Sequence, residues 1–169
     1  MIESEHLIIT PLTYNQLLKY IKLDGSLEVE LGVEPVRRVM SDDFKDAIEK
    51  SIIPAVANPD NNYLYYTLWT ILSKTENRVI GDLCFMGEPN DKGEIEIGYG
   101  TYPDYQNKGF MTEAVAETIK WIKKDQPAVT SIIAFTRNDN PASYAVLKKN
   151  EFVKVAETGL LLKWKLALL

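Results

Sequence analysis

The chain of 169 residues contains one cysteine, Cys84, and one histidine, His6. A single cysteine cannot form an intramolecular disulfide bond, so we expect a protein of a reducing compartment, the cytoplasm. Neither residue has a partner at metal-ligand spacing. We therefore expect no bound metal and a structural role for both.

Long apolar runs and an excess of positive charge are also missing. No stretch approaches the roughly 18 consecutive apolar residues of a membrane span, and the N-terminus lacks the basic and apolar regions of a secretory signal. The 19 lysines and arginines are outnumbered by 24 acidic residues, which gives a net charge of −5. Nucleic-acid binding needs clustered positive charge. We expect neither a membrane nor a nucleic-acid partner.

What is present suits one globular domain spanning residues 1–169. The hydrophobic share is 46% and the charged share 25%, which are ordinary values for a globular protein with a substantial core. The patterns of apolar residues, caps and turns predict ten further elements after a first strand over 6–11, of which the last two are closing strands. The first eight are helices over 13–21, 41–52, 110–124 and 140–150, and strands over 63–72, 79–86, 94–101 and 131–136. Two closing strands follow, over 152–156 and 160–166. This order predicts an α/β fold with a mixed, mostly antiparallel sheet flanked by helices.

The most informative segment joins the strand over 94–101 to the helix after Gly109. Free backbone N–H groups at a helix N-terminus, together with the helix dipole, suit a phosphate or pyrophosphate. Two familiar phosphate motifs fail on spacing. Pro103 stands where a dinucleotide fingerprint needs its third glycine, and Lys108 precedes Gly109 where a P-loop needs the reverse order.

The remaining pattern, Q-x-x-G-x-M from Gln106 to Met111, resembles the Q/R-x-x-G-x-G/A signature of the GNAT N-acetyltransferase superfamily. The wider run, E-I-G-Y from Glu96 followed by Y-Q-N-K-G-F-M-T-E-A, resembles the branch with the ribosomal-protein N-terminal acetyltransferases. The element order is similar to that family over most of the chain, and least so over 22–60. The resemblance implies a GNAT fold, acetyl-CoA as cosubstrate and transfer of its acetyl group to a small-molecule or peptide amine. It leaves open a monomer or a homodimer.

The resemblance also implies a set of cofactor-binding residues. The backbone N–H groups of the loop would face the pyrophosphate, with Lys108 adding charge. Met111 replaces a small residue, so its side chain must point away from the phosphates. A second segment resembles the family's N-x-x-S, and its asparagine also reads as a helix N-cap. The implied residues are Gly98, Tyr99, Gly100, Thr101, Gln106, Asn107, Lys108, Gly109, Phe110, Met111, Asn140 and Ser143. The alternative is a plain strand-to-helix turn.

Glu96 is the first candidate for the base that deprotonates the amine. Strand alternation places it on one face with Glu94 and Gly98. A carboxylate with an ordinary pKa near 4.3 is a poor base for an amine, so desolvation or a relaying water is needed. The alternative is that Glu94 and Glu96 form a solvated strand face without a catalytic role. If Glu96 is not the base, Glu94 is the second candidate for it.

In the family, a tyrosine commonly serves as the acid for the leaving thiolate. Here Leu147 occupies the position of that tyrosine. Ser143 matches the serine of the ribosomal-protein branch and is the first candidate donor, with Tyr144 in reserve. A local hydrogen bond of a first-turn serine is the alternative. The family usually has a glycine after this helix, and Glu151 replaces it here. Because asparagine tolerates the left-handed conformation, we expect Asn150 to adopt it.

Two other functions stay open. Leu147 favours a non-catalytic acyl-CoA-binding module, and an accidental loop match would leave an acidic interaction domain without cofactor. Specificity is expected within residues 14–62, where the resemblance is poorest.

Overall fold

The computed structural model describes residues 1–168. The strands are β1 (Ile2–Glu3), β2 (Leu7–Pro11), β3 (Leu68–Ser73), β4 (Arg78–Phe85), β5 (Glu94–Thr101), β6 (Ser131–Arg137), β7 (Val153–Thr158) and β8 (Leu161–Ala167). The α-helices are α1 (Tyr14–Tyr20), α2 (Ser26–Leu31), α3 (Asp42–Ala47), α4 (Ile53–Ala57), α5 (Phe110–Asp125) and α6 (Pro141–Lys149). A π-helical turn over Ile48–Ile52 joins α3 to α4, and 3-10 turns cover Tyr63–Tyr65 and Pro103–Tyr105.

The strands form one eight-stranded sheet in the order β1-β2-β3-β4-β5-β6-β8-β7. Every neighbouring pair is antiparallel except β5 and β6, which are parallel. This confirms the predicted single-domain, mostly antiparallel sheet flanked by helices. A parallel pair needs a crossover, and α5 supplies it.

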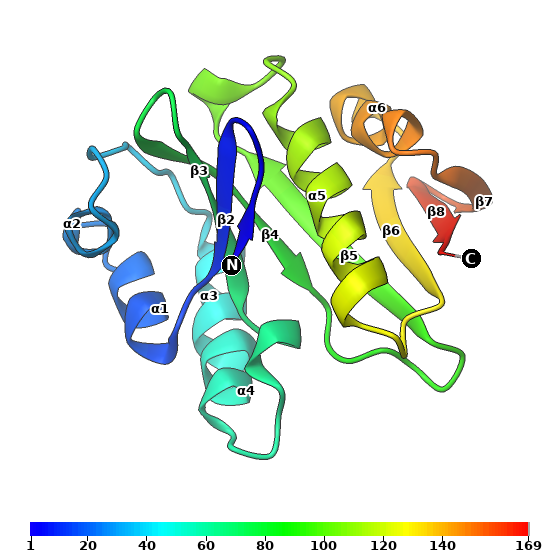
Figure 1. The fold of residues 1–169 in the computed structure, drawn as a ribbon, viewed down its shortest axis with the longest axis horizontal. Coiled ribbons are helices and arrows are strands. Elements are labelled where there is room, and N and C mark those ends of the chain that lie inside the picture. The colour runs from blue at the N-terminus through cyan, green and yellow to red at the C-terminus, as the bar shows by residue number, and fades with distance from the viewer. Residues whose placement is uncertain (169) are drawn as a thin grey trace.

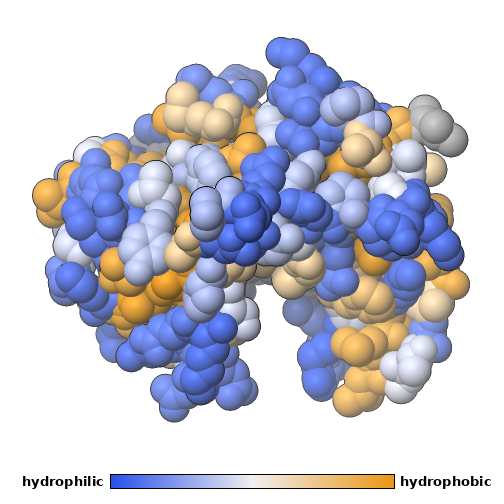
Figure 2. Space-filling view, turned by 90° about the horizontal axis from the view of Figure 1, so that it is seen from below, coloured by the Kyte–Doolittle hydropathy of each residue, from blue (hydrophilic) through white to orange (hydrophobic). Residues whose placement is uncertain are grey.

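Helices cover both faces of the sheet (Figure 1). On one face, Val115 and Ile122 of α5 pack with Ile95 and Ile97 of β5 in the larger core. On the other face, α1 to α4 enclose a smaller core that contains Leu12, Leu17, Tyr20, Leu27, Ile48 and Leu68. Alternation along β5 therefore turns Gly98 and Gly100 toward the α1–α4 face. Seen from below, the molecule is hollowed between its α1–α4 half and its β6–β8 half (Figure 2).

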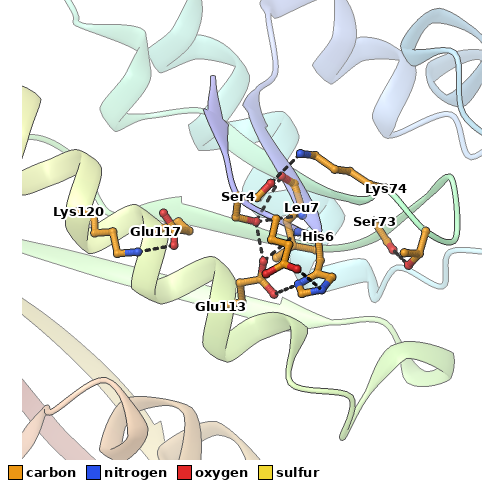
Figure 3. A network of polar contacts seen from close by, with 10 residues as sticks. Ser4, His6, Leu7, Ser73, Lys74, Glu113, Glu117 and Lys120 are labelled. Atoms are coloured by element: carbon orange, nitrogen blue, oxygen red, sulfur yellow. Dashed lines mark hydrogen bonds and ion pairs between the residues drawn. The ribbon is translucent and has the colours of Figure 1, made fainter.

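A polar network fixes the start of α5 to the N-terminal turn (Figure 3). The Glu113 carboxylate accepts hydrogen bonds from the Ser4 hydroxyl at 2.6 Å and the His6 backbone N–H at 3.2 Å. It also lies 3.1 Å from His6 Nδ1. His6 thus has the structural contact that we expected of it.

The helix starts that depend on local chemistry are where the sequence placed them. Thr13 and Gln16 form a capping box at α1, Ser41 caps α3, and Asn140 caps α6 with Pro141 in its first turn. These caps need only residues within one turn, so a sequence pattern is sufficient to find them.

Four expectations were wrong in detail. Strand β3 begins at Leu68 instead of residue 63, because Asn62 accepts a hydrogen bond from the Leu64 N–H and starts a 3-10 turn. Helix α2 was missed, since it is six residues long between two left-handed glycines. The helix predicted over 41–52 contains the π-helical turn. After α6 the left-handed residue is Glu151, with φ 65°, whereas Asn150 has φ −99°.

Candidate functional site

Strands β5 and β6 pair over only part of their lengths. Residues 94–97 of β5 pair with 131–134 of β6, yet β5 continues to Thr101 and β6 to Arg137. The two strands therefore part toward their carboxyl ends. Helices α5 and α6 begin beside that opening, which leaves room for a ligand between them.

The first cavity lies at this opening and has a volume of about 360 Å³. It is bounded by the end of β5, the loop before α5, and the first turns of α5 and α6. Its lining is Tyr99, Gly100, Thr101, Tyr105, Gln106, Asn107, Gly109, Phe110, Met111, Thr112, Asn140, Ala142, Ser143, Ala145, Val146 and Lys149.

The loop before α5 presents a row of free donors to this cavity. Within the described chain, the backbone N–H groups of residues 107–112 donate to no protein acceptor. Asn107 and Gly109 have left-handed φ values of 60° and 83°, and the Gln106 side chain bonds back to the Thr101 carbonyl at 3.2 Å. A Cβ built on Gly109 would meet nothing within 4 Å. This open, donor-rich helix start fits a pyrophosphate.

The opposite wall of the first cavity is the start of α6. The Asn140 side-chain oxygen accepts from the Ser143 N–H at 3.2 Å, and the Tyr99 hydroxyl donates to the Ser143 carbonyl at 2.7 Å. Burial raises the pKa of Tyr99 to about 12, so this hydroxyl remains a donor at neutral pH. Among residues 1–168 the Ser143 hydroxyl has no hydrogen-bond partner. It is free to donate to a ligand.

A second cavity, of about 390 Å³, opens on the α1–α4 side of the sheet. It shares Tyr99, Gly100 and Thr101 with the first cavity. The remaining lining residues are Tyr20, Arg38, Val39, Met40, Phe44, Leu68, Asp82, Leu83, Cys84, Met86, Gly98, Tyr102 and Pro103. The two cavities therefore border the same stretch at the end of β5.

Comparison with known proteins decides the family. A family model described as the acetyltransferase (GNAT) domain matches residues 7–153. The chain belongs to the GNAT acetyltransferase family. This confirms the predicted superfamily, and the protein is an acetyltransferase.

Other proteins are similar to this GNAT protein in sequence or in fold. An uncharacterized N-acetyltransferase, YjdG, from Bacillus subtilis (strain 168) is 31% identical over 132 residues, which are 78% of this chain and 77% of the relative. The ribosomal-protein-S5-alanine acetyltransferase from Vibrio fischeri has a TM-score of 0.68 at 20% identity, covering 98% of this chain and 94% of the other. A ribosomal L7/L12 alpha-N-protein acetyltransferase in complex with coenzyme A has a TM-score of 0.68 at 16% identity, covering 97% and 95%.

Most of the residues that the sequence assigned to the GNAT cofactor line the first cavity. Two do not. Gly98 lines only the second cavity. Lys108 turns outward, where its ammonium lies 3.9 Å from Glu76 and 5.1 Å from the centre of the Tyr105 ring. The side chain of Met111 is buried, with its terminal methyl 3.3 Å from a Cβ built on Gly81. It therefore points into the core.

The predicted catalytic groups are separated. Ser143 lines the first cavity, but Tyr144 lines neither and stacks on Trp164 with ring centres 6.0 Å apart. Leu147 is fully buried in the core. We therefore keep Ser143 ahead of Tyr144 as the group beside a leaving thiolate.

The two glutamates of β5 differ in environment. Hydrogen bonds from Lys165, at 2.6 Å, and from Asn90 hold the pKa of Glu94 below its ordinary value, which disfavours it as a base. Burial raises the pKa of Glu96. Glu96 lines neither cavity, and the Met86 methyl lies 2.8 Å from a Cβ built on the intervening Gly98. Met86, whose backbone N–H donates to the Glu96 carbonyl at 3.0 Å, does line the second cavity.

Sequence reasoning missed Asp82, a buried carboxylate that lines the second cavity. Its Oδ2 accepts hydrogen bonds from the Tyr20 hydroxyl at 2.6 Å and the Tyr102 hydroxyl at 2.7 Å. Burial raises its pKa, against these bonds and the charge of Arg38. The signal was a charged residue in the middle of the apolar run over 79–86.

Lys149, at the end of α6, was also missed and lines the first cavity. Trp69 is 1% exposed and packs against Trp121, so it is a core residue. Over residues 1–168, no cluster of three or more histidine, cysteine, aspartate or glutamate residues could hold a metal. In the same range, no helix has the length and apolar character of a membrane span.

Proposed function

We propose that this protein transfers the acetyl group of acetyl-CoA to a primary amine by direct attack. The single observation that carries the proposal is that two cavities share the end of β5, residues 99–101, in their lining. The first would hold the pyrophosphate and pantetheine of acetyl-CoA, and the second would hold the amine. A thioester at the junction is then within reach of both.

The first cavity supports the donor half of this proposal. The free N–H groups of the loop and the ammonium of Lys149 offer donors and positive charge to phosphates. Asn140 keeps its NH₂ group free after capping α6 with its oxygen, so it can bind a second polar group of the donor. The similar acetyltransferase solved with coenzyme A supports the same ligand.

The chemistry needs a proton acceptor and a thiolate donor. The amine nitrogen attacks the thioester carbon, the C–S bond breaks, and coenzyme A leaves as a thiolate. We assign the stabilising hydrogen bond to the Ser143 hydroxyl. Two carboxylates on this side of the sheet are candidates for the acceptor: Glu96, indicated by the sequence, and Asp82, which lines the second cavity.

Release of coenzyme A thiol over a panel of primary amines, with mass spectrometry of the products, tests the proposal. We expect thiol release matched one to one by an amine product heavier by one acetyl group. Acetyl-CoA binding without turnover on any amine would favour the non-catalytic acyl-CoA-binding module instead. The cytoplasm is the compartment that we propose, because the single cysteine suits reducing conditions.

A further inference from the structure

The mouth of the second cavity is apolar. Three of the large hydrophobic side chains that the protein leaves exposed line it: Val39 at 86% exposure, Met86 at 59% and Phe44 at 38%. They come from two segments that are far apart in sequence, the entry to α3 and the turn after β4. Exposed apolar groups that gather around one cavity indicate a surface that an apolar ligand covers.

The inner end of the same cavity is polar. Asp82 is 7% exposed, and its Oδ1 has no hydrogen-bond partner among the described residues. Asp82 of β4 is paired with Gly100 on the neighbouring strand β5. A Cβ built on Gly100 would meet nothing within 4 Å. The absent side chain leaves space beside Asp82 at the strand end that the two cavities share. The Thr70 Oγ1 on the paired strand β3 is likewise buried without a partner among the described residues. A buried carboxylate that is only partly paired costs free energy, and a cationic nitrogen beside the Tyr20 and Tyr102 hydroxyls, which also line the cavity, would reduce that cost.

Among residues 1–168, Asp82 is the one acidic residue that lines this cavity. Arg38 Nη2 lies 3.0 Å from Glu28 Oε1, and both side chains are nearly fully buried, at 4% and 1% exposure. They neutralise each other. Apart from Arg38 and Asp82, the residues lining this cavity are uncharged. A second ammonium on the acceptor would meet no second carboxylate and would face the apolar mouth.

We propose that the acceptor carries one amine on an apolar body. This proposal rests on the proposed function and names its substrate class. The nitrogen lies at the Asp82 end, and the apolar body contacts Val39, Phe44 and Met86. The ammonium loses one proton to Asp82 through the hydroxyl of Tyr20 or Tyr102. The free amine then forms the C–N bond, the C–S bond breaks, and the second proton leaves the nitrogen for the thiolate.

Two amines of equal length test this proposal: hexylamine, and 1,5-diaminopentane, in which a second ammonium replaces the terminal methyl. We expect kcat/KM for hexylamine to exceed that for the diamine by about tenfold or more, because of the cost of placing a charge in an apolar mouth. Equal use or preference for the diamine overturns the proposal. So does turnover of other primary amines but of neither member of this pair.

A pair of exposed valines supplies a matched control. Val39→Asp adds a carboxylate at the mouth and should shift the preference toward the diamine by about fivefold or more. Val29→Asp makes the same change at a residue of α2 that is 79% exposed and does not line the cavity. It should leave the ratio unchanged. An unchanged ratio in Val39→Asp overturns the proposal, whereas no turnover of any amine contradicts the proposed function itself.

Discussion

At the scale of single residues, Gly109 is the position where the loop enters α5 with a left-handed φ of 83° and open space beside its Cα. Gly109→Glu places bulk and negative charge among the free N–H groups. We expect coenzyme A affinity, measured by calorimetric titration, to fall at least about tenfold, or about 1.4 kcal/mol.

Gly109→Ala is the control for backbone strain, since any side chain is disfavoured at this φ. Without added charge, we expect it to keep affinity within about threefold of the wild type. Unchanged affinity in a folded Gly109→Glu protein would remove the loop from the site.

Ser143 and Tyr144 are adjacent in sequence but face different surroundings. Ser143→Ala should lower kcat and leave acetyl-CoA affinity nearly unchanged, because the hydrogen bond matters most when charge develops on sulfur. Tyr144→Phe keeps the stacking on Trp164 and should have a smaller effect. Steady-state kinetics on an accepted amine compares them, and the reverse order would assign the role to Tyr144.

The pH dependence of turnover separates the two candidate bases. A base acts only when deprotonated, and burial raises the pKa of both Asp82 and Glu96. The wild type should therefore lose activity as pH falls, with a limb above the ordinary carboxylate range. Asp82→Asn keeps an acceptor oxygen for the tyrosines, and we expect it to abolish this limb and lower kcat by about 10²–10⁴-fold.

Glu96→Gln is the companion variant, and Asp91→Asn, in the exposed turn before β5, is the control for an amide substitution. Loss of the acidic limb in Glu96→Gln, with the limb retained in Asp82→Asn, would return the role of base to Glu96.

At the scale of elements, α5 depends on its attachment to the N-terminal turn (Figure 3). Burial alone would raise the pKa of Glu113, but hydrogen bonds from Ser4 and His6 lower it. A lowered folded-state pKa stabilises the protein above the ordinary pKa of 4.5, and the gain is lost as pH falls through the folded-state value.

Glu113→Gln should therefore cost about 1–2 kcal/mol of unfolding free energy at pH 7, measured by urea denaturation. The difference from the wild type should shrink below about pH 4.5. Glu117→Gln, one turn later, removes only an ion pair with exposed Lys120 and should cost less than about 0.5 kcal/mol. Equal costs for both variants would mean that the network does not anchor α5.

The sequence predicted those elements whose signals are local. The caps at Thr13, Ser41 and Asn140 and the loop before α5 each lie within a few residues, so spacing alone locates them. The Asp82 cluster could not be predicted, because Tyr20 and Tyr102 are 62 and 20 residues away along the chain. Their approach depends on how α1 packs on the sheet.

At the scale of the whole molecule, the two faces of the sheet lead to different cavities. The face that packs against α5 leads to the first cavity, and the α1–α4 face forms the floor of the second. Strand β5 belongs to both, since Tyr99, Gly100 and Thr101 line each cavity. One ligand that spans this strand end should therefore fill both.

The central claim is tested most directly by a conjugate of the two substrates. In this conjugate the sulfur of coenzyme A is joined through a –CH₂–C(=O)– linker to the nitrogen of hexylamine. Calorimetric titration should give an affinity at least about 100-fold above that of coenzyme A, because the second half binds without a second association cost. Gly109→Glu should weaken the binding of both coenzyme A and the conjugate, whereas Val39→Asp should reduce the gain of the conjugate over coenzyme A. A conjugate that binds no more tightly than coenzyme A would contradict the account.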